Sequence, residues 1–370
     1  MPEPLKNQFG FSVAERIASA VTAVHPDFDR RAFLEDVRHG YDALELMPRA
    51  RHIADALRRH LPRDYPTALR HLLAAVAGGG VPAAHEGALT GFVYLPVTLF
   101  IGAYGLEHFS ESMDAQRTIT KLFSAEFSIR PYLERYPEKS LALLRRWATD
   151  PDPRVRRLVS EGTRPRLPWA PRLKEFQRDP APVLALLELL KDDPDLVVRR
   201  SVANNLNDIG KDHPDVLVET ARRWMRGADQ NREWIVRHAL RSAIKRGDTD
   251  ALALLGFGTG DALVVRHPRI SPKRLRLGDE VTFSADVHNT SHAAVEVAVD
   301  FRIHYVKANG RTNPKVFKLT RLSLEPDAVS RISKRLLIID LSTRRHYAGR
   351  HSIDLLLNGT VFPIGAFHLE

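Results

Sequence analysis

Apolar residues recur every three or four positions through most of residues 1–258, which is the spacing of amphipathic helices. Several of these periodic segments begin after Asp-Pro or His-Pro, where proline suits the first turn of a helix. Helices are predicted at 14–24, 31–46, 49–60, 107–123, 136–149, 153–161, 181–190, 196–209, 214–225 and 232–245, and one more from Tyr65 to the loop Gly78–Gly80. About a dozen short helices without strands favour a solenoid over a single bundle.

The pattern changes near residue 258. Residues 259–272 are rich in Gly, Pro and charge and read as a linker, and alternating strand-like segments follow at 281–287, 295–305, 315–322, 330–338, 351–357 and 360–369. Asn309-Gly310 and Asn358-Gly359 are strong signals for hairpin turns. The predicted fold class is therefore mainly α: a HEAT-like α-helical solenoid (1–258), a linker, and a small antiparallel β-sandwich of immunoglobulin-like architecture (273–370).

One short motif recurs within the helical part. Val155 begins VRRLVSEGTRPRLPW, Val198 begins VRRSVANNLND and Val236 begins VRHALRSA, with offsets of 43 and 38 residues. This is the spacing of helical-hairpin repeats of the HEAT type. Because arginines alternate with apolar residues, each copy is expected to have one core face and one basic face.

The net charge of +10 is unevenly distributed. Residues 145–178 contain ten Lys or Arg and four Asp or Glu, and residues 262–370 contain 17 basic and 10 acidic side chains. Local basicity of this kind favours an anionic partner such as nucleic acid, although charge alone does not separate nucleic acid from an acidic protein or a membrane surface.

The absence of cysteine excludes disulfides, thiolate nucleophiles and Cys-ligated metal centres. The N-terminus lacks the pattern of a signal peptide, and the longest apolar run, residues 91–105, is too short to span a bilayer and contains Pro96. We expect a soluble cytoplasmic protein without a membrane partner, and a monomer as the default.

The segments SEGTRPRLPW, VRRSVANNLNDIGKDHPD and FDRRAF…ALELMPRARHIADAL resemble the AlkC branch of the AlkD-like DNA glycosylases, and so does the order of helical repeats and β-sandwich. The resemblance covers essentially the whole chain. It implies base excision repair in bacterial cytoplasm, at the nucleoid, by release of cationic N-alkylated bases, chiefly 3-methyladenine and 3-methylcytosine, from duplex DNA. It also implies attack on a lesion that stays largely in the duplex, whereas most glycosylases flip the base. No metal or organic cofactor is implied.

Two glutamates are the candidate catalytic carboxylates. Glu161 lies among arginines near the end of a basic helix, and a carboxylate can stabilise oxocarbenium character on a sugar or orient the attacking water. The alternative is an ion pair of Glu161 with Arg157 or Arg164. Glu126 lies 35 residues earlier, about one repeat, so the two carboxylates are candidates for one site. The alternative for Glu126 is a surface position or an ion pair with Arg130.

Trp169 lies in a proline-rich irregular segment. Its indole could hold a cationic base or sugar by cation–π attraction, and the alternative is packing between repeats. The other tryptophans, Trp147, Trp224 and Trp234, have helical spacing and apolar neighbours and are predicted to be core residues.

The remaining candidates are polar residues of the repeated motif that can bind phosphate or backbone groups of DNA. About half of them are expected to contact DNA and the rest to cover the outer face. They are Arg156, Arg157, Arg164, Arg166, Arg199, Arg200, Asn204, Asn205, Asp208 and Arg237.

No lysine stands out as a Schiff-base nucleophile, which favours a monofunctional glycosylase. Two other functions stay open. One is a non-catalytic repeat protein that binds damaged or distorted DNA, and the other is a protein–protein scaffold, because helical solenoids often bind without chemistry.

Overall fold

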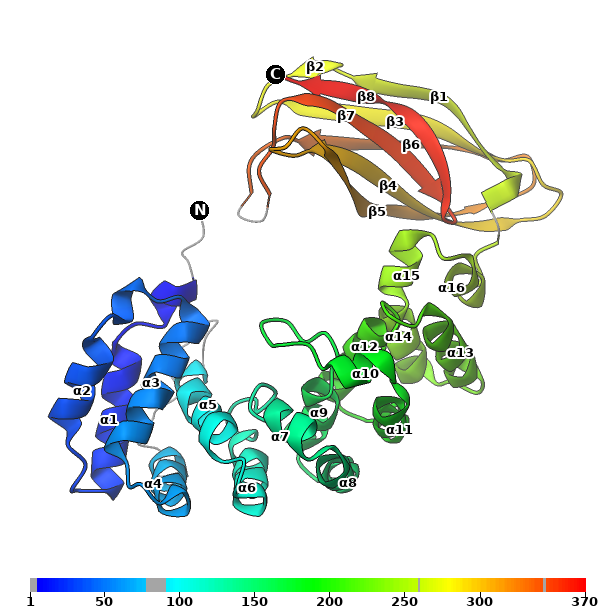
Figure 1. Cartoon of the computed structure of the whole chain (residues 1–370). Helices are drawn as coiled ribbons and strands as arrows, with labels where there is room; N and C mark the ends of the chain where they lie inside the picture. The colour runs from blue at the N-terminus through cyan, green and yellow to red at the C-terminus, as the bar shows by residue number, and fades with distance from the viewer. Residues whose placement is uncertain (1–4, 78–90, 259, 342–343) are drawn as a thin grey trace. The chain divides into compact units, whose positions relative to one another are not determined.

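A computed structural model describes residues 5–77, 91–258, 260–341 and 344–370 (Figure 1). The chain divides into two compact units, Pro2–Asp212 and His213–Glu370. The predicted loop Gly78–Gly80 lies outside the described residues.

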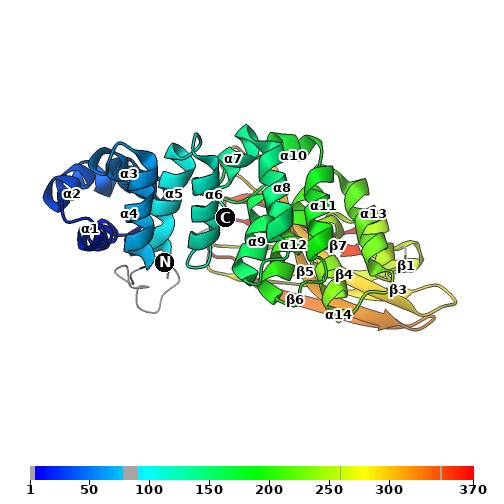
Figure 2. The same cartoon turned by 90° about the horizontal axis from the view of Figure 1, so that it is seen from below.

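The described part of the first unit is helical. Its elements are η1 (Leu5–Gln8), α1 (Ser12–Val24), α2 (Arg30–Arg38), η2 (Tyr41–Ala43), α3 (Leu46–His60), α4 (Tyr65–Ala77), η3 (Phe92–Tyr94), α5 (Leu95–Tyr104), α6 (Phe109–Ile119), α7 (Arg130–Arg135), α8 (Pro137–Trp147), α9 (Pro153–Gly162), α10 (Lys174–Arg178), α11 (Ala181–Leu190) and α12 (Leu196–Ile209). The helices lie side by side in chain order (Figures 1 and 2), and α9 packs against α8, α11 and α12. Their apolar faces form the core between neighbouring helices.

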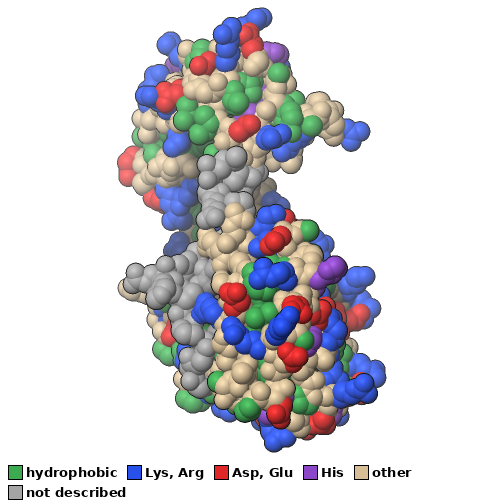
Figure 3. All heavy atoms as spheres, turned by 90° about the vertical axis from the view of Figure 1, so that its left-hand side faces the viewer, with side chains coloured by type: hydrophobic (Ala, Val, Ile, Leu, Met, Phe, Trp, Pro, Cys, Tyr) green, Lys and Arg blue, Asp and Glu red, His purple; other side chains and the backbone are tan. Residues whose placement is uncertain are grey.

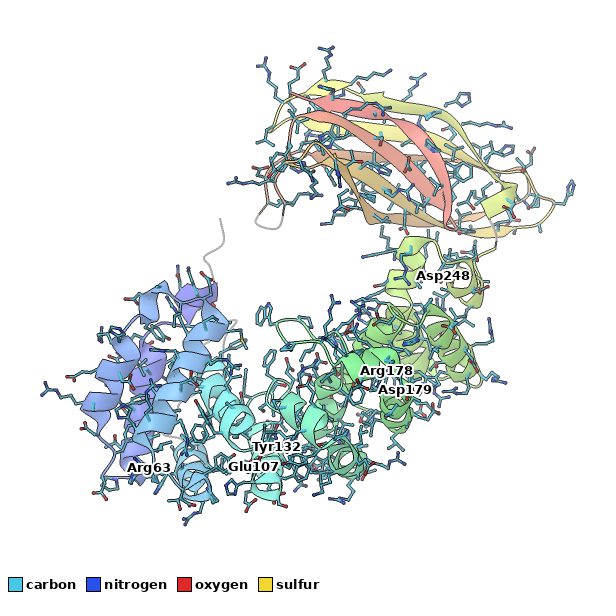
Figure 4. The ribbon with its side chains drawn as sticks, in the orientation of Figure 1. Arg63, Glu107, Tyr132, Arg178, Asp179 and Asp248 are labelled. Atoms are coloured by element: carbon cyan, nitrogen blue, oxygen red, sulfur yellow. The ribbon has the colours of Figure 1, made fainter. Side chains whose placement is uncertain are left out.

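Two departures from the predicted helices have simple causes. α5 was not predicted because it is apolar on nearly every side, and such a helix is buried all round rather than amphipathic. It is joined to α7 by Tyr132 (labelled in Figure 4), whose hydroxyl donates to the carbonyl of Ile101 over 2.8 Å. The helix predicted over 31–46 instead ends after α2, because Gly40 adopts a φ of +76° that terminates a right-handed helix.

The surface of the first helices carries charges of both signs. Figure 3 shows Lys and Arg intermixed with Asp and Glu over this region. Arg59 pairs with Asp36 at 2.8 Å, and Lys6 pairs with Glu45 at 2.6 Å. This face is therefore not a continuous basic strip.

The second unit combines four helices with a β-sandwich. Its elements are α13 (Pro214–Met225), α14 (Gln230–Ala239), α15 (Arg241–Arg246), α16 (Thr249–Leu254), η4 (Gly260–Ala262), β1 (Leu263–Ser271), β2 (Arg274–Leu275), β3 (Glu280–Asn289), β4 (Val295–Val306), β5 (Thr312–Leu324), β6 (Val329–Leu337), β7 (Gly349–Leu357) and β8 (Thr360–Leu369). Asp248 (labelled in Figure 4) caps α16 by accepting a hydrogen bond from the amide of Ala251 over 2.9 Å.

The strands form two sheets, with orders β1-β3-β6 and β2-β8-β7-β4-β5. Alternate residues of β3 and β4, such as Phe283 and Phe301, point into one shared core. All pairings are antiparallel except the short parallel contact of β2 with β8. The predicted fold class, mainly α followed by an antiparallel-rich β domain, is confirmed.

Both predicted hairpin turns are present. Asn309-Gly310 joins β4 to β5, and Asn358-Gly359 joins β7 to β8 with positive φ at both residues, as a type I′ turn requires. Gly359 also touches Gly247 at the end of α15: a Cβ on Gly359 would lie 2.7 Å from the Gly247 carbonyl oxygen. The helices of this unit therefore pack backbone to backbone on the sandwich.

The predicted domain boundaries need correction. Most of the expected linker 259–272 is β1, whose residues pair with β3, and the sandwich thus begins ten residues earlier than predicted. The helices of residues 213–258 cluster with the sandwich and not with the first unit. The segment resembled a linker because β1 is an edge strand in which only Leu263 and Ile270 are buried, and charged residues and Pro268 separate its apolar positions.

Of the four tryptophans, Trp147 and Trp224 are buried as predicted, whereas Trp234 is half-buried and its ring stacks on His238. No helix in the described part of the chain is long and apolar enough to cross a membrane.

Candidate active site

The site is built around α9, the helix of the first repeated motif. Asp152 caps this helix by accepting a hydrogen bond from the amide of Arg154, and Pro153 occupies the first turn. The apolar face, with Val155, Leu158 and Val159, is fully buried. The last turn ends on Glu161 and Gly162, which are buried as well.

Gly162 allows the end of α9 to approach the segment that precedes α7. A Cβ at this position would lie 2.6 Å from Cγ2 of Ile129, closer than real Cβ contacts come. Ile129 follows Glu126 by three residues, so this close packing brings the two predicted carboxylates into the same neighbourhood.

The carboxylate of Glu161 is held at both oxygens. Oε1 accepts from Nη1 of Arg164 over 2.7 Å, and Oε2 accepts from the hydroxyl of Ser201 over 2.6 Å. Its side chain is 8% exposed, so the group keeps a small opening to solvent. The ion pair with Arg164, which the sequence offered as the alternative to a catalytic role, is therefore present.

Glu126 and Glu161 share a guanidinium group. Nη2 of Arg157 lies 2.9 Å from Oε2 of Glu126 and 3.8 Å from Oε1 of Glu161. The hydroxyl of Ser124 also donates to Glu126 over 2.6 Å. The structure thus places the two carboxylates on either side of Arg157, and the partner of Glu126 is Arg157 and not Arg130.

Arg164 continues the chain of alternating charges. Its Nε and Nη2 both lie 2.8 Å from Oδ2 of Asp208, and Lys211 binds the other oxygen of Asp208 at 2.7 Å. Burial by itself would lower the pKa of Arg164, but the attraction of Glu161 and Asp208 raises it above its usual value. We call Glu126, Arg157, Glu161, Arg164 and Asp208 the Glu161 cluster.

Trp169 projects from the loop between α9 and α10. Its side chain is 59% exposed and its φ is +66°, a left-handed conformation that residues other than glycine seldom adopt. Such backbone strain is concentrated at functional sites. Trp169 therefore does not pack between repeats, and its indole is available to a ligand.

Arg130, at the start of α7, binds both ends of this loop through hydrogen bonds. Its buried guanidinium donates to the carbonyls of Gly162, Arg164 and Pro171 over 3.2, 2.8 and 2.5 Å. Removal from solvent lowers the pKa of Arg130 to about 10. Both ends of the Trp169 loop are consequently fixed to α7.

Two predicted phosphate ligands instead stabilise the turns between helices. Arg156 forms a bidentate pair with Asp193 and donates to the carbonyls of Asp150 and Pro151. Arg199, the equivalent residue of the second copy, donates to the carbonyls of Asp193 and Pro194. Arg156 uses Nε, Nη1 and Nη2 in these contacts and Arg199 uses Nη1, so both arginines hold turns, and a contact of either with DNA stays a prediction.

Some of the other predicted DNA ligands have partners inside the protein or are partly buried, and two are exposed without a partner among the described residues. Asn205 is fully buried and donates to Ser160 and Thr163, which docks α12 on α9, and Asn204 is half-buried beside it. Arg166 pairs with Asp212, to which Gln177 also donates.

Arg200 on α12 and Arg237 on α14 are exposed, and the side chains of these two residues make no hydrogen bond or ion pair with the described part of the chain. They remain candidates for phosphate contact, Arg237 within the second unit.

Ser201 and Arg130 were not identified from the sequence as site residues. Ser201 stands in the second repeated motif where the first has the core residue Leu158, and a hydroxyl at a buried repeat position was the available signal. Arg130 gave no such signal, because its three acceptors are carbonyls of a distant loop.

The arrangement combines a nearly buried carboxylate pair, flanking guanidinium groups and an exposed indole. Carboxylates can stabilise a developing sugar cation or receive a proton from water. Arg157 and Arg164 hold them in position, and the indole face of Trp169 attracts cations. The chemistry that fits is hydrolysis through a cationic transition state.

Comparison with known proteins identifies relatives for both the helical part and the β-sandwich. Residues 108–246 match the family model of the DNA alkylation repair enzymes, and residues 264–370 match that of the C-terminal Ig-like domain of the uncharacterised protein YhaZ. The chain is 36% identical to the uncharacterised protein YhaZ of Bacillus subtilis over 358 residues, 96% of this chain and 97% of that protein.

A solved structure is similar over the full length. The alkylpurine DNA glycosylase AlkC of Pseudomonas fluorescens, bound to DNA containing an abasic site analogue, superposes with a TM-score of 0.92 at 38% identity and covers 100% of both chains. The chain therefore belongs to the AlkC-type proteins of the DNA alkylation repair enzyme family.

Proposed function

We propose that this protein is a DNA glycosylase that hydrolyses the N-glycosidic bond of cationic N-alkylated bases in duplex DNA. The observation that carries the proposal is the Glu161 carboxylate, held by Arg164 and Ser201 at the end of α9 and next to Glu126, with which it shares Arg157. The similarity to an alkylpurine glycosylase supports the same reaction class.

In the proposed reaction, the C1′–N bond breaks and its electron pair passes to the base, which leaves neutral because it was cationic in the DNA. The deoxyribose acquires oxocarbenium character, which the anionic carboxylates stabilise. A water oxygen attacks C1′, and the proton that it loses goes to Glu161 or to solvent. The products are the free base and an abasic site.

A cationic leaving group removes the need for a strong general acid, so the protein supplies mainly electrostatics and position. The exposed indole of Trp169 would contact the cationic lesion or sugar, a favourable interaction of about 0.5–2 kcal/mol. An indole fixed on a rigid loop is consistent with attack on a base that is not fully flipped. We propose 3-methyladenine and 3-methylcytosine as substrates.

We propose further that the enzyme has no lyase activity. Lyase chemistry needs a nucleophilic amine, and Lys211, the lysine of the site, is ion-paired with Asp208 at 2.7 Å. An abasic site would then be the final product.

The test is mass-spectrometric detection of free bases released from methylated duplex DNA by the purified protein and by Glu161→Gln. The matched control is Glu175→Gln, because Glu175 also pairs with an arginine three residues later, Arg178, but is exposed. We expect release by the wild type and the control and none by Glu161→Gln, with DNA binding retained by all three.

The second candidate is a non-catalytic protein that binds damaged DNA, favoured by the exposed Trp169 and Arg200. It predicts binding to methylated duplex without release of any base over hours. In that case Glu161→Gln would behave as the wild type does.

A further inference from the structure

Arg130 joins the end of α9 to the far end of the loop between α9 and α10, residues 163–173. Its Nη1 donates to the carbonyl oxygens of Gly162 and Arg164 over 3.2 and 2.8 Å, and its Nη2 donates to that of Pro171 over 2.5 Å. All three acceptors are backbone atoms. One guanidinium group therefore constrains the path of the chain at the start and at the end of the loop.

These carbonyls flank the two groups of the candidate site. Gly162 directly follows Glu161 in the last turn of α9, and Pro171 follows Trp169 by two residues. The place of the indole relative to the carboxylate thus depends on how the two ends of the loop are fixed.

The base to which the loop is tied is itself firmly packed. Tyr132, two residues after Arg130, is fully buried and donates to the carbonyl of Ile101 over 2.8 Å (Figure 4). Ile129, the residue before Arg130, is also fully buried, and a Cβ on Gly162 would lie 2.6 Å from its Cγ2. Arg130 accordingly connects the loop to a part of the core that has no room to shift.

Packing alone does not fix the far end of the loop. The end of the loop and the start of α10, residues 171–176, line an open cavity of about 620 Å³ together with Leu133 and Pro137. This side of the segment is therefore incompletely packed against α7 and α8. The hydrogen bond from Arg130 to Pro171 supplies a connection that packing does not.

Charge favours an arginine at this place. The carbonyl groups at the end of a helix carry partial negative charge, and Glu161 adds a carboxylate in the same turn of α9. Burial lowers the pKa of Arg130 to about 10, which leaves its guanidinium cationic at neutral pH. Arg130 thus binds the end of α9 as a cation.

We propose that Arg130 is a positioning residue for base release, which keeps Trp169 at a fixed place beside Glu161 without itself contacting DNA. The proposal rests on the proposed glycosylase function. A residue that acts through another costs no more than removal of that other residue, so the effect of losing the Arg130 contacts should not exceed that of Trp169→Gly.

The test variant is Arg130→Lys. Lysine keeps the positive charge but has one nitrogen in place of the two that bind the carbonyls, so it does not hold both ends of the loop. The matched control is Arg49→Lys on α3. Arg49 is also buried, and its Nη1 and Nε donate to the carbonyls of Lys6 and Leu44 over 2.7 and 2.9 Å, away from the site.

The first measurement is single-turnover release of bases from methylated duplex, at a temperature at which every variant is folded. Arg130→Lys should slow release about 2- to 30-fold, the range of a cation–π contact, with unchanged affinity for undamaged duplex. In the Trp169→Gly background, Arg130→Lys should cause no additional loss. Arg49→Lys should release bases at the rate of the wild type.

The second measurement does not depend on base release. Arg172 is exposed and Leu173 follows it, so trypsin can cleave this bond when the end of the loop opens. Arg130→Lys should accelerate cleavage after Arg172 relative to the other sites of the chain, and Arg49→Lys should not. Pro131 follows position 130, so the new lysine adds no cleavage site.

The two measurements separate failure of this proposal from failure of the glycosylase function. If the wild type releases no base, the glycosylase function fails together with the role of Arg130 in it, while accelerated cleavage still shows that Arg130 fixes the loop. If the wild type releases bases, three results each overturn the positioning role. They are a release rate of Arg130→Lys equal to that of Arg49→Lys, losses of Arg130→Lys and Trp169→Gly that multiply, and unchanged cleavage after Arg172.

Discussion

The hydroxyl of Ser201 on α12 donates a hydrogen bond to the Glu161 carboxylate on α9 over 2.6 Å. Residues 40 positions apart in the sequence thus meet between two stacked repeats, and the second repeat orients a carboxylate that the first one carries. The segment that directly follows α9 is also joined to α12, through Arg164 and Asp208. The candidate active site is accordingly a product of repeat stacking.

Ser201→Ala should slow base release about tenfold, because Glu161 loses the donor that fixes its orientation. The free energy of unfolding should also fall by about 1–3 kcal/mol, since a buried acceptor loses its partner. Single-turnover release rates and urea unfolding measure the two effects. Ser19→Ala, which removes an exposed hydroxyl bonded to the carbonyl of Glu15, is the control and should change neither. A loss of stability with an unchanged rate would refute the positioning role.

Trp169→Gly should separate function from stability. A left-handed backbone costs a residue other than glycine about 1–2 kcal/mol, so glycine should stabilise the folded state at this position. Glycine also has more conformational freedom in the unfolded chain, which opposes this gain. The free energy of unfolding should therefore change by less than about 1 kcal/mol. Base release should fall about 2- to 30-fold, the equivalent of a cation–π contact of about 0.5–2 kcal/mol. Thermal melting and release of 3-methyladenine test this pair of outcomes. A large loss of stability would show that the indole packs on the protein after all.

Arg199 and Arg200 are adjacent, but substitution of Arg199 should affect stability and substitution of Arg200 should affect DNA binding. Arg199→Gln should lower stability by about 1–3 kcal/mol, because two carbonyls of the preceding turn lose their donor, and should leave the salt dependence of DNA binding unchanged. Arg200→Gln should leave stability unchanged and reduce the slope of log K against log salt by about 1. Chemical denaturation and salt titrations of duplex binding distinguish them. Equal effects of both variants on DNA binding would contradict the assignment of Arg199 to the turn.

Asp300→Asn should make stability depend differently on pH. Desolvation raises the pKa of Asp300, so its charged form destabilises the folded state above the folded pKa. The penalty disappears below the ordinary value of 3.8, where the carboxyl is neutral in both states. Asn should therefore be more stable than the wild type at pH 7 and equal to it near pH 3. Urea unfolding at several pH values checks this sign, and a wild type that is more stable at pH 7 would reverse it.

The sequence alone determined the order of elements. Helical periodicity identified most helices from α1 to α14, and alternation with Asn-Gly turns identified β3 to β8, because both signals are local and depend on burying one face of each element. It failed for α5, which is buried on nearly every side, and for β1, an edge strand whose residues are mostly exposed and do not alternate between apolar and polar. Neither element has the one-sided pattern that the periodicity detects.

The candidate site was also partly visible in the sequence. The carboxylate of Glu161 among arginines and the irregular setting of Trp169 singled out both residues, because charge density and proline content are properties of a short segment. The partner of each charge was not determined. Arg156 and Arg157 are neighbours in the chain, yet one pairs with Asp193 in a turn and the other with Glu126 in the site.

Only the tertiary structure decided which arginines form hydrogen bonds or ion pairs within the protein and which remain available to DNA. A guanidinium on a helix can reach a carbonyl, a carboxylate or solvent, and the choice depends on which turn of the neighbouring repeat lies beside it. Local sequence sets what a side chain can bind, while the packing of repeats sets what lies within its reach.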